Sequence, residues 1–153
     1  MGMPSPARLQ PTGETLQFMQ RLWDLVHALD VRSKRMASTV GVTGPQRLVI
    51  RVVGQLTEPT ASDIAATLKM HPSTLTGIVS RLQKQGLLTR ALDKDDRRRS
   101  RFKLTDKGLK VDRERKGTVE AAIRRALGRA NVTTIAQTVE MLELLVAELE
   151  RED

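Results

Sequence analysis

The 153-residue sequence contains no cysteine and only two histidines. The absence of cysteine excludes disulfide bonds, thiolate metal sites and redox sensing by thiols. Two histidines without a cysteine offer too few ligands for a zinc centre, so we expect neither a metal nor a cofactor. No run of about 18 apolar residues occurs, and the N-terminus lacks the charged-then-apolar order of a secretory signal. We therefore expect a soluble cytoplasmic protein.

The sequence also lacks the motifs of common enzyme classes. No Ser/His/Asp or Cys/His arrangement and no glycine-rich phosphate loop occurs in usable form, so we do not expect an enzyme. A length of 153 residues fits one domain with a single core, or one small domain with additional helices that a partner covers.

The positive charge is concentrated in one part of the chain. The formal net charge is +8. Residues 69–103 carry ten Lys/Arg and three Asp/Glu, a net of +7, whereas residues 1–68 carry +2 and residues 104–153 carry −1. Basic surfaces bind polyanions because they release counterions from phosphates. This concentration predicts a nucleic-acid binder with a defined contact face.

Apolar periodicity and helix-start signals predict six helices. Thr43 with Gln46, and Thr60 with Asp63, have the spacing of capping boxes at helix starts. Elsewhere, apolar residues recur at three- and four-residue steps. The expected helices are 14–36, 44–53, 61–68, 72–85, 105–130 and 133–150.

Two predicted strands, 86–92 and 101–105, flank the charged segment DKDDRRRSR. In the second strand two apolar residues alternate with two basic ones, as in a ribbon with one face on a core. The charged segment has three interpretations: a solvated hairpin tip, a metal-binding carboxylate cluster, or a charged finger for another macromolecule. A calcium loop needs alternating oxygen ligands, a glycine and a distant glutamate, which are missing here, and four arginines would repel a cation. The metal site is therefore excluded, and the other two interpretations stay open.

The helix predicted at 72–85 has an outer face unlike that of most surface helices. At about 100° per residue, its apolar residues form one stripe, which consists of Leu75, Ile78, Val79 and Leu82. The remaining face carries small hydrogen-bonding residues and two cations: Ser73, Thr74, Thr76, Gly77, Ser80, Arg81 and Lys84. Short side chains of this kind allow a helix to enter the major groove and contact base edges. The alternative is an ordinary surface helix that lacks acidic residues.

Three short helices, a tight turn and a basic ribbon in this order resemble the winged helix-turn-helix of the MarR family of bacterial transcriptional regulators. The segments that carry the resemblance are GVTGPQRLVIRVVG, TASDIAATLKMHPSTLTGIVSRLQKQGLLTR and DKDDRRRSRFKLTDKG. The last is similar to the family's wing, usually written D-P-x-D-R-R-x-x-x-L-x-L-T-x-x-G. The matching residues are Asp93, Asp96, Arg97, Arg98, Leu104, Thr105 and Gly108, whereas Lys94 replaces the usual proline and Phe102 an aliphatic residue.

The resemblance, which covers about residues 14–150, implies a mainly α fold with a small β-wing, a winged helix-turn-helix flanked by N- and C-terminal dimerisation helices. The expected divisions are a flexible N-terminal arm (1–13), an N-terminal helix (14–40), the winged domain (41–105) and C-terminal dimerisation helices (106–153). The implied function is that of a homodimeric, sequence-specific transcriptional regulator of double-stranded DNA, a ligand-responsive repressor on a palindromic operator. We expect it in the bacterial cytoplasm, associated with the nucleoid.

For DNA binding, the resemblance implies that helix 72–85 lies in the major groove and the wing in the adjacent minor groove. The expected contacts are Ser73, Thr74, Thr76, Gly77, Ser80, Arg81 and Lys84 on the helix, and Arg97, Arg98, Arg99 and Arg101 on the wing. Arg98 is the expected wing-tip residue. The last helix carries an apolar stripe wider than one intrachain contact requires, which suits the intertwined dimer of this family.

For effector binding, the resemblance implies a small aromatic or anionic molecule between the dimerisation helices and the winged domain. Trp23 and His27 lie one turn apart, as do Arg47 and Arg51, and together they would suit an aromatic carboxylate. The alternative places Trp23 in the core or the dimer contact, and the two arginines at solvent or the DNA backbone.

Two other functions remain open from the sequence. One is an architectural winged-helix protein that binds DNA without sequence specificity, which a specificity ratio near one would indicate. The other is a winged-helix protein-interaction module, which a failure to bind duplex DNA at low salt would indicate.

Overall fold

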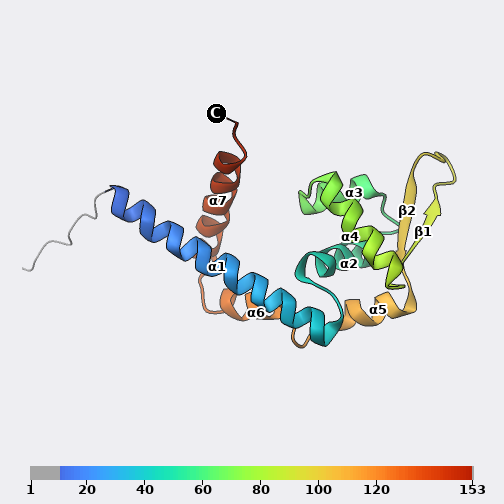
Figure 1. Ribbon diagram of the computed structural model, residues 1–153, viewed down its shortest axis with the longest axis horizontal. Helices are drawn as coiled ribbons and strands as arrows, with labels where there is room; N and C mark the ends of the chain where they lie inside the picture. The colour runs from blue at the N-terminus through green and yellow to red at the C-terminus, as the bar shows by residue number, and fades with distance from the viewer. Residues whose placement is uncertain (1–10, 153) are drawn as a thin grey trace, which may run out of the picture.

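Figure 1 shows the computed structural model, which describes residues 11–152. The helices are α1 (Pro11–Val40), α2 (Gly44–Gln55), α3 (Ala61–Leu68), α4 (Pro72–Lys84), α5 (Asp106–Arg113), α6 (Val119–Leu127) and α7 (Val132–Leu149), and the strands are β1 (Leu88–Leu92) and β2 (Ser100–Leu104). Helices α2 to α5 and the strands form one packed body; α1 extends away from it, α6 lies beside α1, and α7 follows α6 (Figure 1). A mainly α fold with a small β-wing confirms the expected fold class. The expected N-terminal arm falls mostly on residues 1–10, outside the described residues.

The packed body has a hydrophobic core of its own. Helices α2, α3 and α4 and the ribbon each contribute buried apolar side chains, all of which lie between residues 42 and 104. The strands pair antiparallel, with Leu88 opposite Leu104 and Arg90 opposite Phe102. The apolar side of β2 therefore faces the helices, as the alternation of its residues predicted.

Both predicted capping boxes are confirmed. The Thr43 amide donates to Gln46 Oε1 at 3.0 Å, and the Thr60 amide donates to Asp63 Oδ2 at 2.8 Å. Each threonine hydroxyl accepts the reciprocal bond from the backbone of its partner. These bonds satisfy amide donors that a helix start leaves open, which is why α2 and α3 begin where local sequence predicted.

The prediction of one continuous helix over 105–130 is wrong. Segment 114–118 separates α5 from α6 and turns the chain. Within it Gly117 has φ of +74°, a left-handed conformation incompatible with an α-helix interior. The Thr118 hydroxyl then caps α6 by accepting the Ala121 amide at 3.2 Å. The abundant Lys, Arg and Glu in this stretch favour helix and concealed the break.

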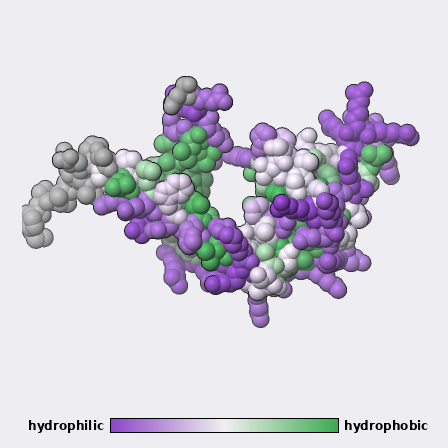
Figure 2. Space-filling model, in the orientation of Figure 1, coloured by the Kyte–Doolittle hydropathy of each residue, from purple (hydrophilic) through white to green (hydrophobic). Residues whose placement is uncertain are grey.

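Helices α1, α6 and α7 leave many apolar side chains exposed. No residue of α6 or α7 is buried, and α1 exposes a series that includes Leu16, Met19, Trp23 and Val26. Figure 2 shows apolar surface over α7 and the adjoining part of α1. Apolar patches this extensive are typical of interaction surfaces. Even so, none of the helices within residues 11–152 has the length and hydropathy to cross a membrane.

Candidate nucleic-acid interface

Helix α4 packs one side on the core and presents the other to solvent. His71 caps its start, because His71 Nδ1 accepts the Ser73 amide at 3.2 Å. Leu75, Val79 and Leu82 are buried beneath the helix. The residues expected on the outer face are all exposed: Ser73, Thr74, Thr76, Gly77, Ser80, Arg81 and Lys84. We call this set the outer face of α4.

Gly77 lies in the middle of the outer face. A Cβ atom at this position would have no neighbour within 4 Å, so packing inside the chain does not require a glycine here. Glycine in a helix interior lowers stability by about 0.5–1 kcal/mol relative to alanine. The missing side chain therefore leaves space on the surface at a cost in stability.

Asp93 organises the loop at the tip of the wing. Its Oδ1 atom accepts the amides of Asp95 and Asp96 at 2.8 and 3.2 Å, and its Oδ2 atom accepts from Arg101 Nε. These backbone hydrogen bonds, and then the Arg101 guanidinium, hold the pKa of the Asp93 carboxyl below its usual value. The carboxylate is buried although it belongs to a surface loop. Asp93 therefore stabilises the loop conformation.

The four wing arginines have different surroundings. Arg101 is half-buried: besides its pair with Asp93, its Nη1 donates to the Glu58 carbonyl at 3.0 Å, which ties the wing to the loop between α2 and α3. Arg97, Arg98 and Arg99 are exposed, and Arg99 lies 3.7 Å from Asp96 in an exposed pair of little energetic value. Three guanidinium groups at the tip are thus accessible, whereas Arg101 acts as an anchor.

A groove of about 500 Å³ separates the wing from α4 and the N-terminal end of α3. Four predicted contact residues line it: Thr76, Ser80, Arg98 and Arg99. It is also lined by polar residues that were not selected from the sequence: Thr60, Ser62, Gln83, Arg90 and Ser100. Arg90 Nε donates to Ser100 Oγ at 2.6 Å. The sequence signal for Arg90 was the alternation of side chains along a strand. Because Leu88 is apolar and Arg90 is two residues further on, both side chains lie on the side of β1 that faces the helices.

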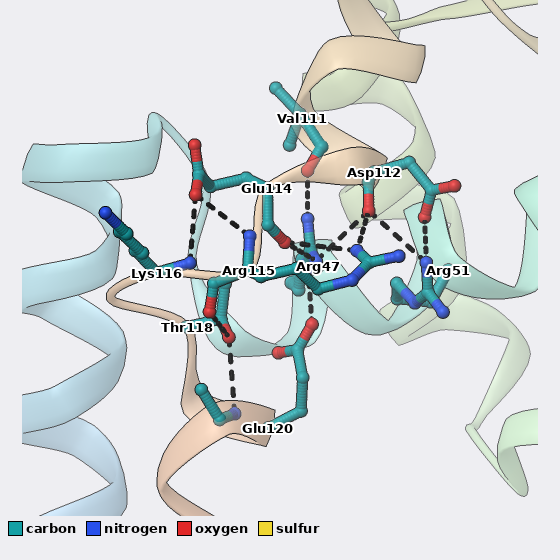
Figure 3. A network of polar contacts seen from close by, with 10 residues as sticks. Arg47, Arg51, Val111, Asp112, Glu114, Arg115, Lys116, Thr118 and Glu120 are labelled. Carbon is teal, nitrogen blue, oxygen red and sulfur yellow. Dashed lines mark hydrogen bonds and ion pairs between the residues drawn. The ribbon is translucent and has the colours of Figure 1, made fainter.

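The structure places Arg47 inside the protein (Figure 3). Its side chain is 1% exposed, and its Nε donates to Glu120 Oε1 at 2.7 Å. Its two Nη atoms donate to the carbonyls of Val111, Asp112 and Glu114, at the C-terminal end of α5. The Val111 carbonyl also accepts the Glu114 amide at 3.1 Å, whereas helix ends leave such terminal carbonyls without the usual amide of the next turn, so an arginine from α2 completes the end of α5. The same guanidinium links α2 to α6.

Of the other three expected effector residues, Arg51 lies beside Arg47, since both donate to the Asp112 carbonyl, whereas Trp23 and His27 are on α1. Arg51 is partly exposed and pairs with Asp112 at 2.7 Å (Figure 3). Trp23 and His27 are exposed on α1, and Trp23 retains 64% of its accessible surface. Of the four expected residues, only Arg47 lines the cleft between α1, α2 and α6. A shared site for all four remains a prediction.

Three packed helices followed by a two-stranded antiparallel ribbon define a winged helix-turn-helix protein. Residues 40–99 match the model of the MarR family. The transcriptional regulator FarR of Neisseria gonorrhoeae is 30% identical over 125 residues, which cover 80% of this chain and 81% of FarR. The chain therefore belongs to the MarR family of transcriptional regulators, which are not enzymes, and the resemblance noted in the sequence is confirmed.

Solved structures share this fold. Sco3205, a MarR family regulator of Streptomyces coelicolor described in complex with DNA, superposes with a TM-score of 0.75 at 18% identity, covering 94% of this chain and 95% of Sco3205. The PcaV regulator of the same organism, described with its natural ligand, superposes with a TM-score of 0.65 at 23% identity. That match covers 98% of this chain and all of PcaV.

Proposed function

We propose that this regulator binds a palindromic operator as a homodimer and represses transcription, with α4 in the major groove and the wing in the adjacent minor groove. One observation carries the proposal: the outer face of α4 lacks acidic residues and flanks a groove whose opposite wall is a wing with three exposed arginines. The complex of Sco3205 with DNA supports the same use of the fold here.

The two surfaces suit different features of a duplex. Serine, threonine and glycine keep the outer face of α4 short enough for the major groove, where hydroxyl groups reach base edges. A narrow minor groove concentrates negative potential and attracts arginine, and Arg98 is the proposed residue for that contact. Arg97 and Arg99 are then available for phosphates, while Arg101 fixes the angle of the wing.

The exposed apolar surface of α1, α6 and α7 supports a dimer of identical chains. Twofold pairing through these helices would bury side chains that a single copy leaves in water. It would present two copies of α4 to successive major grooves, so the operator should have half-sites about 10 bp apart. The regulator should also respond to a small molecule, as the ligand complex of PcaV suggests for this fold.

Two alanine variants test the roles of wing and helix, once fragments recovered from bound genomic DNA have identified the operator. Arg98→Ala should weaken operator binding by about 1–3 kcal/mol and relax specificity at one position. Lys84→Ala should weaken binding to operator and to random duplex alike. It should also lower the slope of log affinity against log salt concentration by about 1. Fluorescence anisotropy over a salt series measures both, and Lys116→Ala, exposed between α5 and α6, is the matched control.

Equal losses on operator and random duplex for both variants would contradict this division of roles. If the wild type bound operator and random duplex with nearly the same affinity, it would be an architectural DNA-binding protein. Absence of duplex binding at low salt would indicate a protein-interaction module.

A further inference from the structure

Arg90 lies in the groove between the wing and α4, although it belongs to neither the tip of the wing nor the outer face of α4. In the antiparallel register it stands opposite Phe102, so the two side chains leave the ribbon on the same side. Phe102 is buried and also lines the groove. The aliphatic part of Arg90 therefore leaves the ribbon beside an aromatic ring, and its guanidinium group lies in the groove.

A single hydrogen bond orients this guanidinium group. Arg90 Nε donates to Ser100 Oγ at 2.6 Å, from one strand of the ribbon to the other. Among residues 11–152 no carboxylate pairs with Arg90, and its two Nη atoms have no hydrogen-bond partner. These two atoms form a fork that matches two oxygens of a phosphate group. Because the side chain is already held at Nε, it loses less conformational entropy on binding than a free arginine does.

The rest of the groove also suits an anion. No acidic residue lines it, whereas three arginines do: Arg90, Arg98 and Arg99. Ser62 of α3 and Ser80 of α4 line the opposite wall, and in the part of the chain that the structure describes their exposed hydroxyl groups form no hydrogen bond. Asp63 follows Ser62 but does not line the groove, because its carboxylate accepts the amide and hydroxyl of Thr60 at 2.8 Å each. The groove therefore offers hydrogen-bond donors from both walls and no opposing negative charge.

We propose that Arg90 binds one phosphate of the DNA strand that crosses this groove, with Ser62 and Ser80 donating to the same strand from the opposite wall. The inference rests on the proposed function. A sugar-phosphate strand separates each major groove from the adjacent minor groove, so a protein with α4 in one and the wing in the other straddles that strand. The groove between α4 and the wing is the space through which the strand passes. A phosphate contact carries no base information, but it fixes the register in which α4 meets the bases.

Operator duplexes with one uncharged methylphosphonate in each half-site, at symmetry-related positions, test this contact on the full chain. For the wild type, replacing the phosphate bound by Arg90 should lower affinity by about tenfold for each half-site. Arg90→Met should bind the unmodified operator more weakly by a similar factor. It should show no further loss at that one phosphate and keep the wild-type losses at the others, since a contact can be removed only once.

Two controls separate the contact from general charge and from a structural role. Arg113→Met removes the same charge from an exposed position on α5 outside the groove, and should lower affinity by less than about twofold. Arg90→Lys keeps the charge without the fork, so it should retain the salt dependence of binding but only part of the affinity. In Arg90→Met the slope of log affinity against log salt concentration should fall by about 1 for each copy bound, which a purely structural role would not produce.

Wild-type losses at every phosphate in Arg90→Met, or an unchanged salt slope, would overturn the inference. If Arg90→Met fails to fold, Arg90→Lys decides, because its loss at the one phosphate should be smaller than that of the wild type. Preference of the wild type for operator over random duplex is measured separately, and its absence refutes the proposed function. The contact of Arg90 is then judged on random duplex, which carries the same phosphates, by the fall in salt slope of Arg90→Met.

Discussion

Substituting Gly77 by alanine should change stability and DNA affinity in opposite directions. The added methyl group meets no atom within 4 Å, so it introduces no clash in the free protein. Alanine in a helix interior is favoured over glycine by about 0.5–1 kcal/mol, and Gly77→Ala should therefore stabilise the fold by that amount. For a chain of this length the melting temperature should rise by about 1–4 °C.

In the proposed complex the same methyl group occupies space that DNA requires. Gly77 lies about 200° around the helix from buried Leu75, close to the point furthest from the core. Overfilling a packed contact typically costs about 1–3 kcal/mol, so operator affinity should fall by about five- to 150-fold. Urea unfolding followed by circular dichroism measures stability, and anisotropy of a labelled operator measures affinity.

Gly13→Ala provides the control for this experiment. Gly13 lies in α1, where an added Cβ atom would also meet nothing within 4 Å, but it is remote from the wing and α4. It should alter stability slightly and leave operator affinity unchanged. Operator affinity of Gly77→Ala within twofold of wild type would refute the proposal that this face contacts DNA. A loss of stability in Gly77→Ala would refute the inference that an added methyl group meets no neighbouring atom.

Two further predictions concern charges that the fold itself uses. Asp93→Asn should be less stable than wild type at pH 7, because backbone hydrogen bonds depress the pKa of Asp93 and so stabilise the fold above its unfolded pKa of about 4. The difference should shrink as pH falls through the folded pKa, and a constant difference from pH 7 to pH 3 in urea titrations would contradict this. Arg47→Met should lower the free energy of unfolding by about 3–5 kcal/mol, since it removes the buried partner of Glu120 and the hydrogen bonds that join α2 to the end of α5. Arg51→Met, one turn away and partly exposed, should cost about 1 kcal/mol or less, so similar losses in both variants would show that burial of Arg47 is unimportant.

Features determined by neighbouring residues were predictable from the sequence. The capping boxes at Thr43 and Thr60, the outer face of α4 and the hairpin around Asp93 all depend on spacings of a few residues. The family resemblance rested on the same local patterns. Local spacing was enough to predict these features because a helix face or a capped helix start depends on residues only a few positions apart.

Features that depend on distant partners were not predictable in this way. Arg47 and Glu120 are 73 residues apart, and no local pattern shows that they meet. Before the fold is known, a buried arginine and a solvated one have the same appearance in sequence. The break at 114–118 was missed for a related reason, since helix-favouring residues surround Gly117 and part of the cause lies in α2.

The arginine that closes α5 also has a consequence for protein engineering. Chimeras between regulators of this kind would naturally be joined in the loop at 114–118, which is exposed over most of its length. Yet the direction in which the chain leaves that loop depends on residue 47, which stands in the other half of such a graft. A transplanted C-terminal segment, which brings Glu120 with it, should therefore keep its native orientation only if the recipient half has an arginine at the position of Arg47.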